Sequence, residues 1–433
     1  MTIVHKSLLS PIALVALFFG SCGPAAPPVR VATEHANVSR LVKPIGSTEA
    51  LSGVVLRIRT LDAEELQSAV DDPRPRIVVF EVGGVIDLKG RALVVRHPHL
   101  ILAGQTAPDP GITLIRGGLL VETSHVTIQD IASRSGNAYG DDAMGARRAS
   151  DVVFDHCSAT WGVDENLSVS GPADADPEAT SQDVTLRSCL IAEGLSHSVH
   201  AKGEHSKGTL IHDSVHNVTI EGCLYAHNEQ RNPRLKGGTT TTLTSNVIYN
   251  WGSQCIGVGK VGNKKTLTPA QTTLTNVVAI AGSDTRSMEM VKSVDPGARV
   301  TFIDDIAVDA HGGRLRLNDD GVIVTNVSSA PNWQIVERVL RTAGSRSSHR
   351  DPIDTRIVQS VIDGTGHIID SQDQAGGYPT RAMTTRALVV PETHRDEWLQ
   401  RLSDDLEVDR TIDITPLWKR LHITAAPSPD SQR

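Results

Sequence analysis

Carboxylate and cationic side chains gather between residues 142 and 236 of the 433-residue chain, in a pattern suited to chemistry on an acidic polymer. The acidic candidates are Asp142, Asp155, Asp164 and Glu165. The cationic candidates flank an Asn-Pro pair and are Arg231, Arg234 and Lys236. Carboxylate oxygens suit a hard cation such as Ca²⁺, and the cationic side chains suit a polymer that carries its own carboxylates.

Such a polymer can be broken by removing the proton on C5 of a uronic acid and expelling the oxygen on C4. Removal of that proton adds negative charge next to a carboxylate, so the site needs cations against the carboxylate and a base near C5. The net charge of −8 argues against general nucleic-acid binding, and aromatic residues make up only 3% of the chain, which disfavours stacking on bases.

The elements that must position these residues follow a short repeat. The pattern Val-x-Ile-x-x-Ile or Val-x-x-x-x-Cys starts at Val126, Val152, Val184 and Val218, and weaker copies start near Leu243, Leu274, Val300 and Val322. Each copy alternates apolar and polar residues, as a half-buried strand does. Strands at these intervals without helices between them predict an all-β right-handed parallel β-helix. A propeller is the rival, but its repeat is longer and more regular.

Cysteines repeat with the strands. Cys157, Cys189 and Cys223 fall at the same place in consecutive copies, which predicts an interior stack of free thiols rather than disulfides. Short helical caps are expected at Leu61–Val70, with Asp62 as N-cap, and at 394–402 and 416–421, where they would pack along the outside or cap the last coil.

The chain begins like an exported protein. Residues 1–22 read as a signal peptide, and Phe19-Gly20-Ser21-Cys22 resembles a bacterial lipoprotein cleavage site with Cys22 as the lipidated residue. Residues 23–45 are expected to form a tether, 46–380 the β-helix, and 381–433 a C-terminal extension with short helices. A secreted protein or a membrane-tethered lipoprotein of a bacterium is therefore expected, acting as a monomer.

Between about residues 75 and 380, an ordered set of motifs resembles the pectate lyase family of secreted polysaccharide lyases, especially its bacterial branch. The motifs are Gly104-Gln105-Thr106-Ala107-Pro108, Asp142-Ala143-Met144, Phe154-Asp155-His156-Cys157-Ser158, Trp161-Gly162-Val163-Asp164-Glu165, Glu193-Gly194-Leu195, His227-Asn228, Arg231-Asn232-Pro233-Arg234 and Asn246-Val247-Ile248-Tyr249-Asn250-Trp251. The resemblance implies a parallel β-helix with a calcium-dependent cleft on one face.

Residue by residue, the resemblance places Asp142 and Asp164 on calcium ligands and Asp155 on a supporting cleft aspartate. Alternation along its strand also directs Asp155 outward, toward the expected cleft. A further family carboxylate is Ser168 here, and Glu165 is expected to substitute for it as a ligand.

Arg231 matches the family's proton-abstracting arginine, while Arg234 and Lys236 match basic residues that face the substrate. Free guanidinium has a pKa of about 12.5 or higher, so an arginine base predicts activity that rises on the alkaline side.

The family's remaining substrate lysine falls in the stretch 196–205, where Lys202 is the expected equivalent, with His200 and His197 as alternatives. Three histidines within nine residues also allow a zinc site or, for another uronate, a neutral histidine base. Hydrogen bonding along the cleft is the favoured role.

The resulting hypothesis is a calcium-dependent pectate lyase that cleaves polygalacturonate. The alternatives are a lyase for another uronate polymer, a β-helix glycosidase with two flanking carboxylates, and a β-helix that binds polysaccharide without cleaving it.

Overall fold

A computed structural model describes residues 47–172, 177–259, 268–294, 297–328 and 332–423. The chain divides into two units, and the fold below is that of the unit 43–433. The predicted signal peptide, Cys22 and the tether lie outside the described residues, so their predictions stay open.

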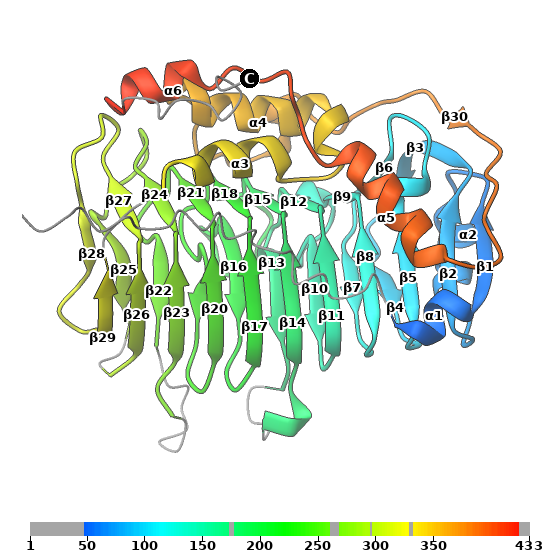
Figure 1. The fold of residues 1–433 in the computed structure, drawn as a ribbon, viewed down its shortest axis with the longest axis horizontal. Coiled ribbons are helices and arrows are strands. Elements are labelled where there is room, and N and C mark those ends of the chain that lie inside the picture. Colours follow the sequence, from blue (N-terminus) through cyan, green and yellow to red (C-terminus); the bar gives the residue numbers. More distant parts are fainter. Residues whose placement is uncertain (1–46, 173–176, 260–267, 295–296, 329–331, 424–433) are drawn as a thin grey trace, which may run out of the picture. The chain divides into compact units, whose positions relative to one another are not determined.

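Within these residues the strands stack into three long sheets, as Figure 1 shows. Successive strands along the chain enter the three sheets in turn, so one strand from each sheet makes one coil. Among the described residues, every pairing between labelled strands is parallel except that between β3 and β30. The prediction of a right-handed parallel β-helix is confirmed.

The strand bounds are as follows. The eleven-stranded sheet contains, in spatial order, β1 (Val54–Ile58), β2 (Arg76–Phe80), β5 (Leu100–Ala103), β8 (Val126–Gln129), β11 (Ser150–Asp155), β14 (Gln182–Arg187), β17 (His216–Glu221), β20 (Thr240–Thr244), β23 (Gln271–Thr275), β26 (Arg299–Ile303) and β29 (Ile323–Ser328). The nine-stranded sheet contains β28 (Arg316–Asn318), β25 (Glu289–Ser293), β22 (Ile256–Val258), β19 (Arg234–Leu235), β16 (Lys207–Ile211), β13 (Glu165–Ser170), β10 (Met144–Arg147), β7 (Leu119–Val121) and β4 (Leu93–Val95). The ten-stranded sheet contains β27 (Ile306–Val308), β24 (Val278–Ile280), β21 (Val247–Tyr249), β18 (Leu224–Ala226), β15 (Leu190–Ala192), β12 (Ser158–Thr160), β9 (Ile131–Arg134), β6 (Ile112–Ile115), β3 (Val82–Asp87) and β30 (Thr384–Thr385).

The predicted repeat corresponds to the eleven-stranded sheet. Val126, Val152, Val184 and Val218 are in register on adjacent strands. The next two copies start two residues before Leu243 and Leu274, because Thr241 and Thr272 hold the buried position that valine holds elsewhere. A threonine in a valine position hid the pattern there.

The cysteine prediction is confirmed. Cys157, Cys189 and Cys223 are free and fully buried, and the amide of Cys189 donates to Sγ of Cys223 at 3.4 Å. Asn246 continues the column at the next coil, where its side chain accepts from the amide of Cys223 at 2.9 Å and donates to the carbonyl of Ile220 at 2.8 Å. This column inside the coils therefore consists of three small cysteine side chains followed by an asparagine that hydrogen-bonds to the backbone.

Helices cover the outside of the coils. The helices are α1 (Thr48–Ser52), α2 (Ala63–Val70), α3 (Gln334–Thr342), α4 (Pro352–Asp363), α5 (Arg395–Leu406) and α6 (Thr415–Arg420), and the short 3₁₀ turns are η1 (Gly104–Thr106), η2 (Gly136–Ala138), η3 (Pro177–Ala179), η4 (Ser347–His349) and η5 (Gln372–Ala375). Asp62 caps α2 as predicted, accepting from the amide of Glu64 at 2.9 Å. Helix α2 buries Leu66 and Val70 in the core, at the β1 end of the stack (Figure 1).

The two C-terminal helices were predicted, and they pack outside the coils. Helix α5 buries Leu399 against the outer side of β2 and β5, and α6 buries Leu417 in the apolar layer of α3 and α4. That layer lies over outward-facing side chains of the ten-stranded sheet, among them Leu190 and Leu224. The sequence pattern did not predict α3 and α4, which follow the last coil strand inside the range assigned to the β-helix. Among the described residues no helix has the length and apolar character needed to cross a membrane.

Candidate active site

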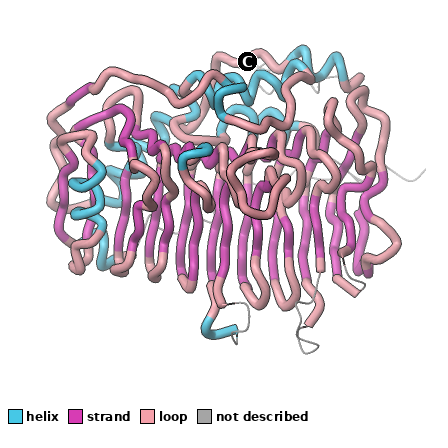
Figure 2. The backbone as a smooth tube through the Cα atoms, turned by 180° about the vertical axis from the view of Figure 1, so that it is seen from behind, coloured by secondary structure: helices cyan, strands magenta, loops and turns pink. Residues whose placement is uncertain are grey.

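Asp142, Asp164 and Arg231 all lie just before strands of the nine-stranded sheet. Figure 2 shows the stacked coils from the side opposite to Figure 1. Asp142 lies two residues before β10, Asp164 lies directly before β13, and Arg231 lies three residues before β19. Met144 pairs with Leu167 and Leu167 with Thr209, so the strands are in register and the segments that enter them collect at a common edge. The spatial arrangement expected of these three residues is therefore present.

Three carboxylates form an acidic group there. Oxygens of Asp141, Asp142 and Asp164 lie within 4.8 Å of one another. Burial raises the pKa of Asp142, the charges of Asp141 and Asp164 raise it further, and the hydroxyl of Ser168 opposes them by bonding to the carboxylate. A bound cation would relieve this crowding of negative charge. Ca²⁺ binds oxygens at about 2.3–2.6 Å, so ligands of one ion can lie up to about 5 Å apart, and the acidic group fits it.

Glu165 does not join this group. Its carboxylate forms an ion pair with the guanidinium of Arg231, and its amide donates to Oδ1 of Asp142 at 2.9 Å. The expectation that Glu165 serves as a metal ligand is thus not met by the geometry, which puts Asp141 in that place. Glu165 instead connects the acidic group to Arg231.

Arg231 is held firmly by its backbone. Its φ of 64° is in the left-handed region, and its carbonyl accepts from the amide of Thr209 at 2.6 Å. A Cβ at Gly208 would lie 2.5 Å from that carbonyl oxygen, so only glycine allows this approach. Burial lowers the pKa of Arg231, against the opposing charges of Asp164 and Asp142.

Asp164 is bound by two histidines. Nε2 of His205 lies 2.6 Å from Oδ1, and Nε2 of His200 lies 3.6 Å from Oδ2. Burial alone would raise the pKa of Asp164, but the hydrogen bond and charge of His205, with Lys202 and His200, outweigh it and lower the pKa to about 2. Asp164 is therefore ionised at neutral pH.

The three basic residues expected to bind substrate lie at different positions relative to Arg231 and the acidic group. Arg234 opens β19 beside the site and pairs in register with Leu210. Lys236 lies further along and is already engaged, with Nζ 2.6 Å from Oδ2 of Asp213 and 3.3 Å from Nε2 of His212. Lys202 lies exposed in the loop before β16, where its charge acts on Asp164.

Lys207 was missed by sequence reasoning. It begins β16, pairs in register with Glu165 and bridges to Gln230, and so lies between Asp164 and Arg231 along the edge. It is 7% exposed, and burial lowers its pKa although Asp164 and nearby glutamates oppose the shift. Lys207 is the first residue of the strand Lys207–Ile211, and this position separates it from the loop residue Lys202.

Asp155 lies elsewhere, contrary to expectation. It ends β11 in the eleven-stranded sheet, is 2% exposed, and binds Nδ1 of His156 at 2.8 Å and Nη2 of Arg187 at 2.8 Å. Charge and hydrogen bonds from these two partners overcome burial and hold its pKa far below the usual range. Asp155 does point outward from its strand, but on a different sheet, so its role is to bind adjacent coils together.

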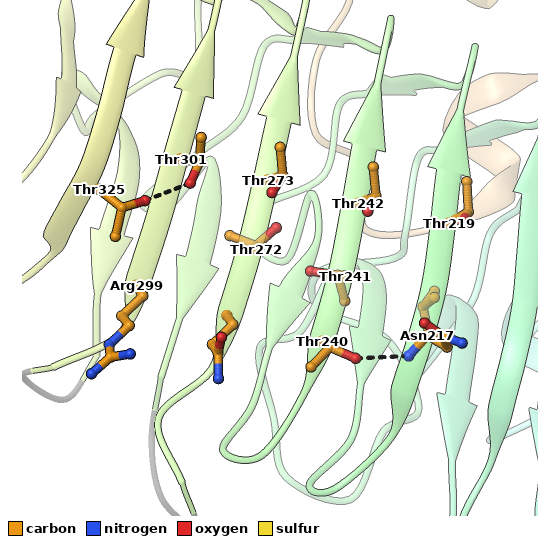
Figure 3. Close-up of a pocket in the computed structure, with 12 residues that line it drawn as sticks. Asn217, Thr219, Thr240, Thr241, Thr242, Thr272, Thr273, Arg299, Thr301 and Thr325 are labelled. Atoms are coloured by element: carbon orange, nitrogen blue, oxygen red, sulfur yellow. Dashed lines mark hydrogen bonds between the residues drawn. The ribbon is translucent and has the colours of Figure 1, made fainter.

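A shallow depression of about 380 Å³ lies on the outer side of the eleven-stranded sheet, away from these candidates (Figure 3). Its outward rows are mostly threonine, and its lining residues are Asn217, Val218, Thr219, Thr240, Thr241, Thr242, Gln271, Thr272, Thr273, Arg299, Thr301 and Thr325. Its lining contains no carboxylate and one cationic side chain, Arg299, so it lacks the ligands for a metal ion and the base that β-elimination needs.

Comparison with known proteins shows sequence similarity over about half of the chain. No family model matches the chain. A probable pectate lyase C from Aspergillus oryzae is 35% identical over 211 residues, which cover 48% of this chain and 45% of that protein. A protein of the same name from Emericella nidulans is 34% identical over 202 residues, 46% and 43% of the two chains. The chain therefore spans a little under half the length of these curated relatives.

Solved structures show a weaker likeness. A pectate lyase from Bacillus sp. N165, in complex with trigalacturonate, covers 69% of this chain and 95% of its own at 11% identity and a TM-score of 0.46. An alginate lyase from Paenibacillus sp. FPU-7 covers 61% and 98% at 17% identity and a TM-score of 0.44. With TM-scores below 0.5, these likenesses carry no argument about function.

Strand pairing and site together define a parallel β-helix protein with acidic and basic side chains gathered before the strands of the nine-stranded sheet. The predicted resemblance to the pectate lyase family is confirmed by the similarity to the fungal pectate lyases.

Proposed function

We propose that the protein is a pectate lyase that cleaves a polygalacturonate-type polysaccharide by β-elimination, with Ca²⁺ as cofactor. The observation that carries the proposal is the meeting of Asp142, Asp164 and Arg231 at one sheet edge, with Glu165 bridging them. The similarity to proteins named pectate lyase supports the same reaction class.

The residues divide the chemistry as follows. Asp141, Asp142 and Asp164 would hold the cation, which when bound supplies positive charge against the uronate carboxylate. Lys207 and Arg234 would bind the carboxylates of the polymer, with Lys202 and Lys236 at greater remove and His200 held beside Asp164.

Arg231 would take the proton from C5. A base must be neutral when it accepts the proton, and burial favours the neutral guanidinium by lowering its pKa. The ion pair with Glu165 opposes this and fixes the direction of the guanidinium. Activity is therefore expected to rise toward alkaline pH, as more of Arg231 loses its proton.

The test is the ultraviolet absorbance of the C4–C5 double bond, followed on a panel of uronate polymers with and without chelator. The wild type should form unsaturated products from polygalacturonate, and chelation should stop it. Arg231→Ala should lower the rate by at least about 10²-fold, as expected for loss of a general base. The matched control is Arg299→Ala, an exposed arginine on the eleven-stranded sheet.

Hydrolysis without absorbance would identify a glycosidase, and retention of polymer without shortening would identify a binding protein. A fold-intact Arg231→Ala variant with wild-type turnover would remove the proposed base. The export signal, the lipid anchor at Cys22, a bacterial source and a monomeric state rest on the sequence alone.

A further inference from the structure

The loop between β15 and β16 carries three histidines, and two of them turn toward one carboxylate. His200 and His205 place their rings 3.9 Å apart with Nε2 of each directed at Asp164. Their side chains are 7% and 6% exposed, whereas His197 of the same loop is 68% exposed and bound to Asp370. The pair is therefore enclosed.

The loop is closed at its base by backbone hydrogen bonds. The amide of His205 donates to the carbonyl of Ser196 at 2.9 Å, and that of Ser206 to the carbonyl of Leu195 at 2.9 Å. On the far side, the amide of Ser196 donates to the carbonyl of Ile369 at 2.8 Å. These bonds hold the loop in place, so His200 and His205 are positioned before any ligand arrives.

The three donor atoms have the spacing of a metal site. One nitrogen from each ring and a carboxylate oxygen lie within 4.8 Å of one another. In a tetrahedral zinc site with bonds of about 2.0–2.1 Å, ligand atoms lie about 3.3–3.4 Å apart. Nε2 of His200 lies 3.6 Å from Oδ2 of Asp164, close to this value. Nε2 of His205 lies 2.6 Å from the other oxygen, Oδ1, so that contact must lengthen by less than 1 Å and the carboxylate must turn one oxygen toward the ion.

This group shares Asp164 with the acidic group but differs from it in its other donors. Two imidazole nitrogens and one carboxylate suit Zn²⁺ and its first-row neighbours, whereas Ca²⁺ takes oxygen ligands. We propose that Asp164, His200 and His205 bind a first-row divalent transition-metal ion. Three protein ligands leave a fourth position for water or for an oxygen of a bound molecule. The proposal does not depend on lyase activity, because binding needs no turnover.

Two contacts must change on binding. The hydrogen bond between Nε2 of His205 and Oδ1 of Asp164 must break, because the metal takes the lone pair of that nitrogen. The amide of Lys202 lies 3.3 Å from Nδ1 of His200 and donates to it, which leaves the ring proton on Nε2. A metal requires the lone pair of Nε2, so the proton must pass to Nδ1 and the amide of Lys202 must lose this partner. The amide is on an exposed turn where water can replace it.

The test is titration of the chelator-treated full-length protein with ZnCl₂, followed by calorimetry, and with CoCl₂, followed by the visible absorption of tetrahedral Co²⁺. We expect one equivalent of Zn²⁺ to be bound by the wild type. His200→Ala and His205→Ala should each weaken that binding by more than the 10–100-fold that loss of an outer-shell partner typically costs. His197→Ala is the matched control from the same loop and should bind as the wild type does.

A folding control keeps the test decisive. His205→Gln retains a hydrogen-bond donor to Asp164 but lacks the imidazole, so it should keep the wild-type melting temperature and still lose the Zn²⁺ equivalent. Arg231→Ala should lose lyase activity and keep the metal, which separates the two proposals. Absence of a bound equivalent in the wild type, or equal affinity in folded His200 and His205 variants, would overturn the inference.

Discussion

Arg231 and Glu165 form an ion pair that spans an intervening coil: Glu165 belongs to β13, Arg231 precedes β19, and β16 lies between them. Lys207 lies on that middle strand, in register with Glu165. Coil stacking thus brings an acid, a lysine and an arginine into one row, although 66 residues separate the two ends of the row in the sequence.

Replacing Glu165 by glutamine should move the pH profile of elimination. The carboxylate stabilises the protonated guanidinium, so its loss lowers the pKa of Arg231 and increases the neutral fraction at any given pH. If Arg231 is the base, the alkaline rise in kcat shifts to lower pH, even though looser positioning reduces the maximum. An unshifted profile with a uniformly lower kcat would show that Glu165 only positions the arginine.

Lys207 is expected to contribute to substrate binding. Lys207→Met keeps most of the buried stem and removes the charge, and a lost charge-assisted hydrogen bond of about 1.5–3 kcal/mol lowers kcat/KM by roughly 10- to 150-fold. Steady-state kinetics on polygalacturonate measure this. Lys292→Met, on β25 of the same sheet and 45% exposed, serves as the comparison and should change kcat/KM little.

Gly208 should tolerate no side chain. A Cβ there would meet the carbonyl oxygen of Arg231 at 2.5 Å and Oδ1 of Asn232 at 3.0 Å. Gly208→Ala should therefore destabilise the fold by about 1–3 kcal/mol and displace Arg231, lowering both the melting temperature and the rate. Gly140→Ala, where a Cβ would have no neighbour within 4 Å, should leave the melting temperature nearly unchanged.

Asp305 should make stability fall as pH rises. Burial raises its pKa to about 7, against two backbone amides that favour the charged form. Between pH 3.8 and about 7 the folded state holds a proton that the unfolded state has lost, so the free energy of unfolding decreases across this window and is level above it.

The substitution Asp305→Asn tests this. Asparagine already occupies the equivalent corner at Asn246, where it pairs with backbone groups of the preceding coil. Oδ2 of Asp305 accepts from the amide of Ile303 at 2.8 Å, and the NH₂ group of asparagine cannot accept there, so the variant has a loss of stability that does not depend on pH. Relative to the wild type, the variant should gain up to about 4 kcal/mol between pH 4 and pH 8, at about 1.4 kcal/mol per pKa unit. Denaturation curves at the two pH values decide it, and an equal difference from the wild type at both would point to a cause other than ionisation.

Much of the scaffold could be predicted because its core residues repeat. Apolar positions such as Val126 and Val152 recur at the strand start and specify the coil directly. The cover of α3 was also readable in part, since Ile335, Val336, Val339 and Leu340 form an apolar stripe at helical spacing. Thr241 shows where this pattern fails, because a sequence pattern of polar and apolar residues counts a buried threonine as polar, just as it counts an exposed one.

The site was predictable less evenly. Alternation correctly directs Asp155 outward, but a coil has three outer faces, and a period of two does not say which sheet a strand joins. Lys202 and Lys207 lie five residues apart, and only the start of β16 decides which of them reaches the cleft edge. The ion pair of Glu165 with Arg231 depends on coil register, which no local pattern encodes.

The threonine rows of the eleven-stranded sheet bear on how such a chain can change in length. Thr219, Thr242, Thr273 and Thr301 stand directly above one another on successive strands, about 4.8 Å apart. Charged residues in those positions would repel their own neighbours at every added level. A column of neutral hydroxyl groups carries no such penalty. Duplication or deletion of one whole coil in this region would therefore place no like charges next to one another along the threonine column.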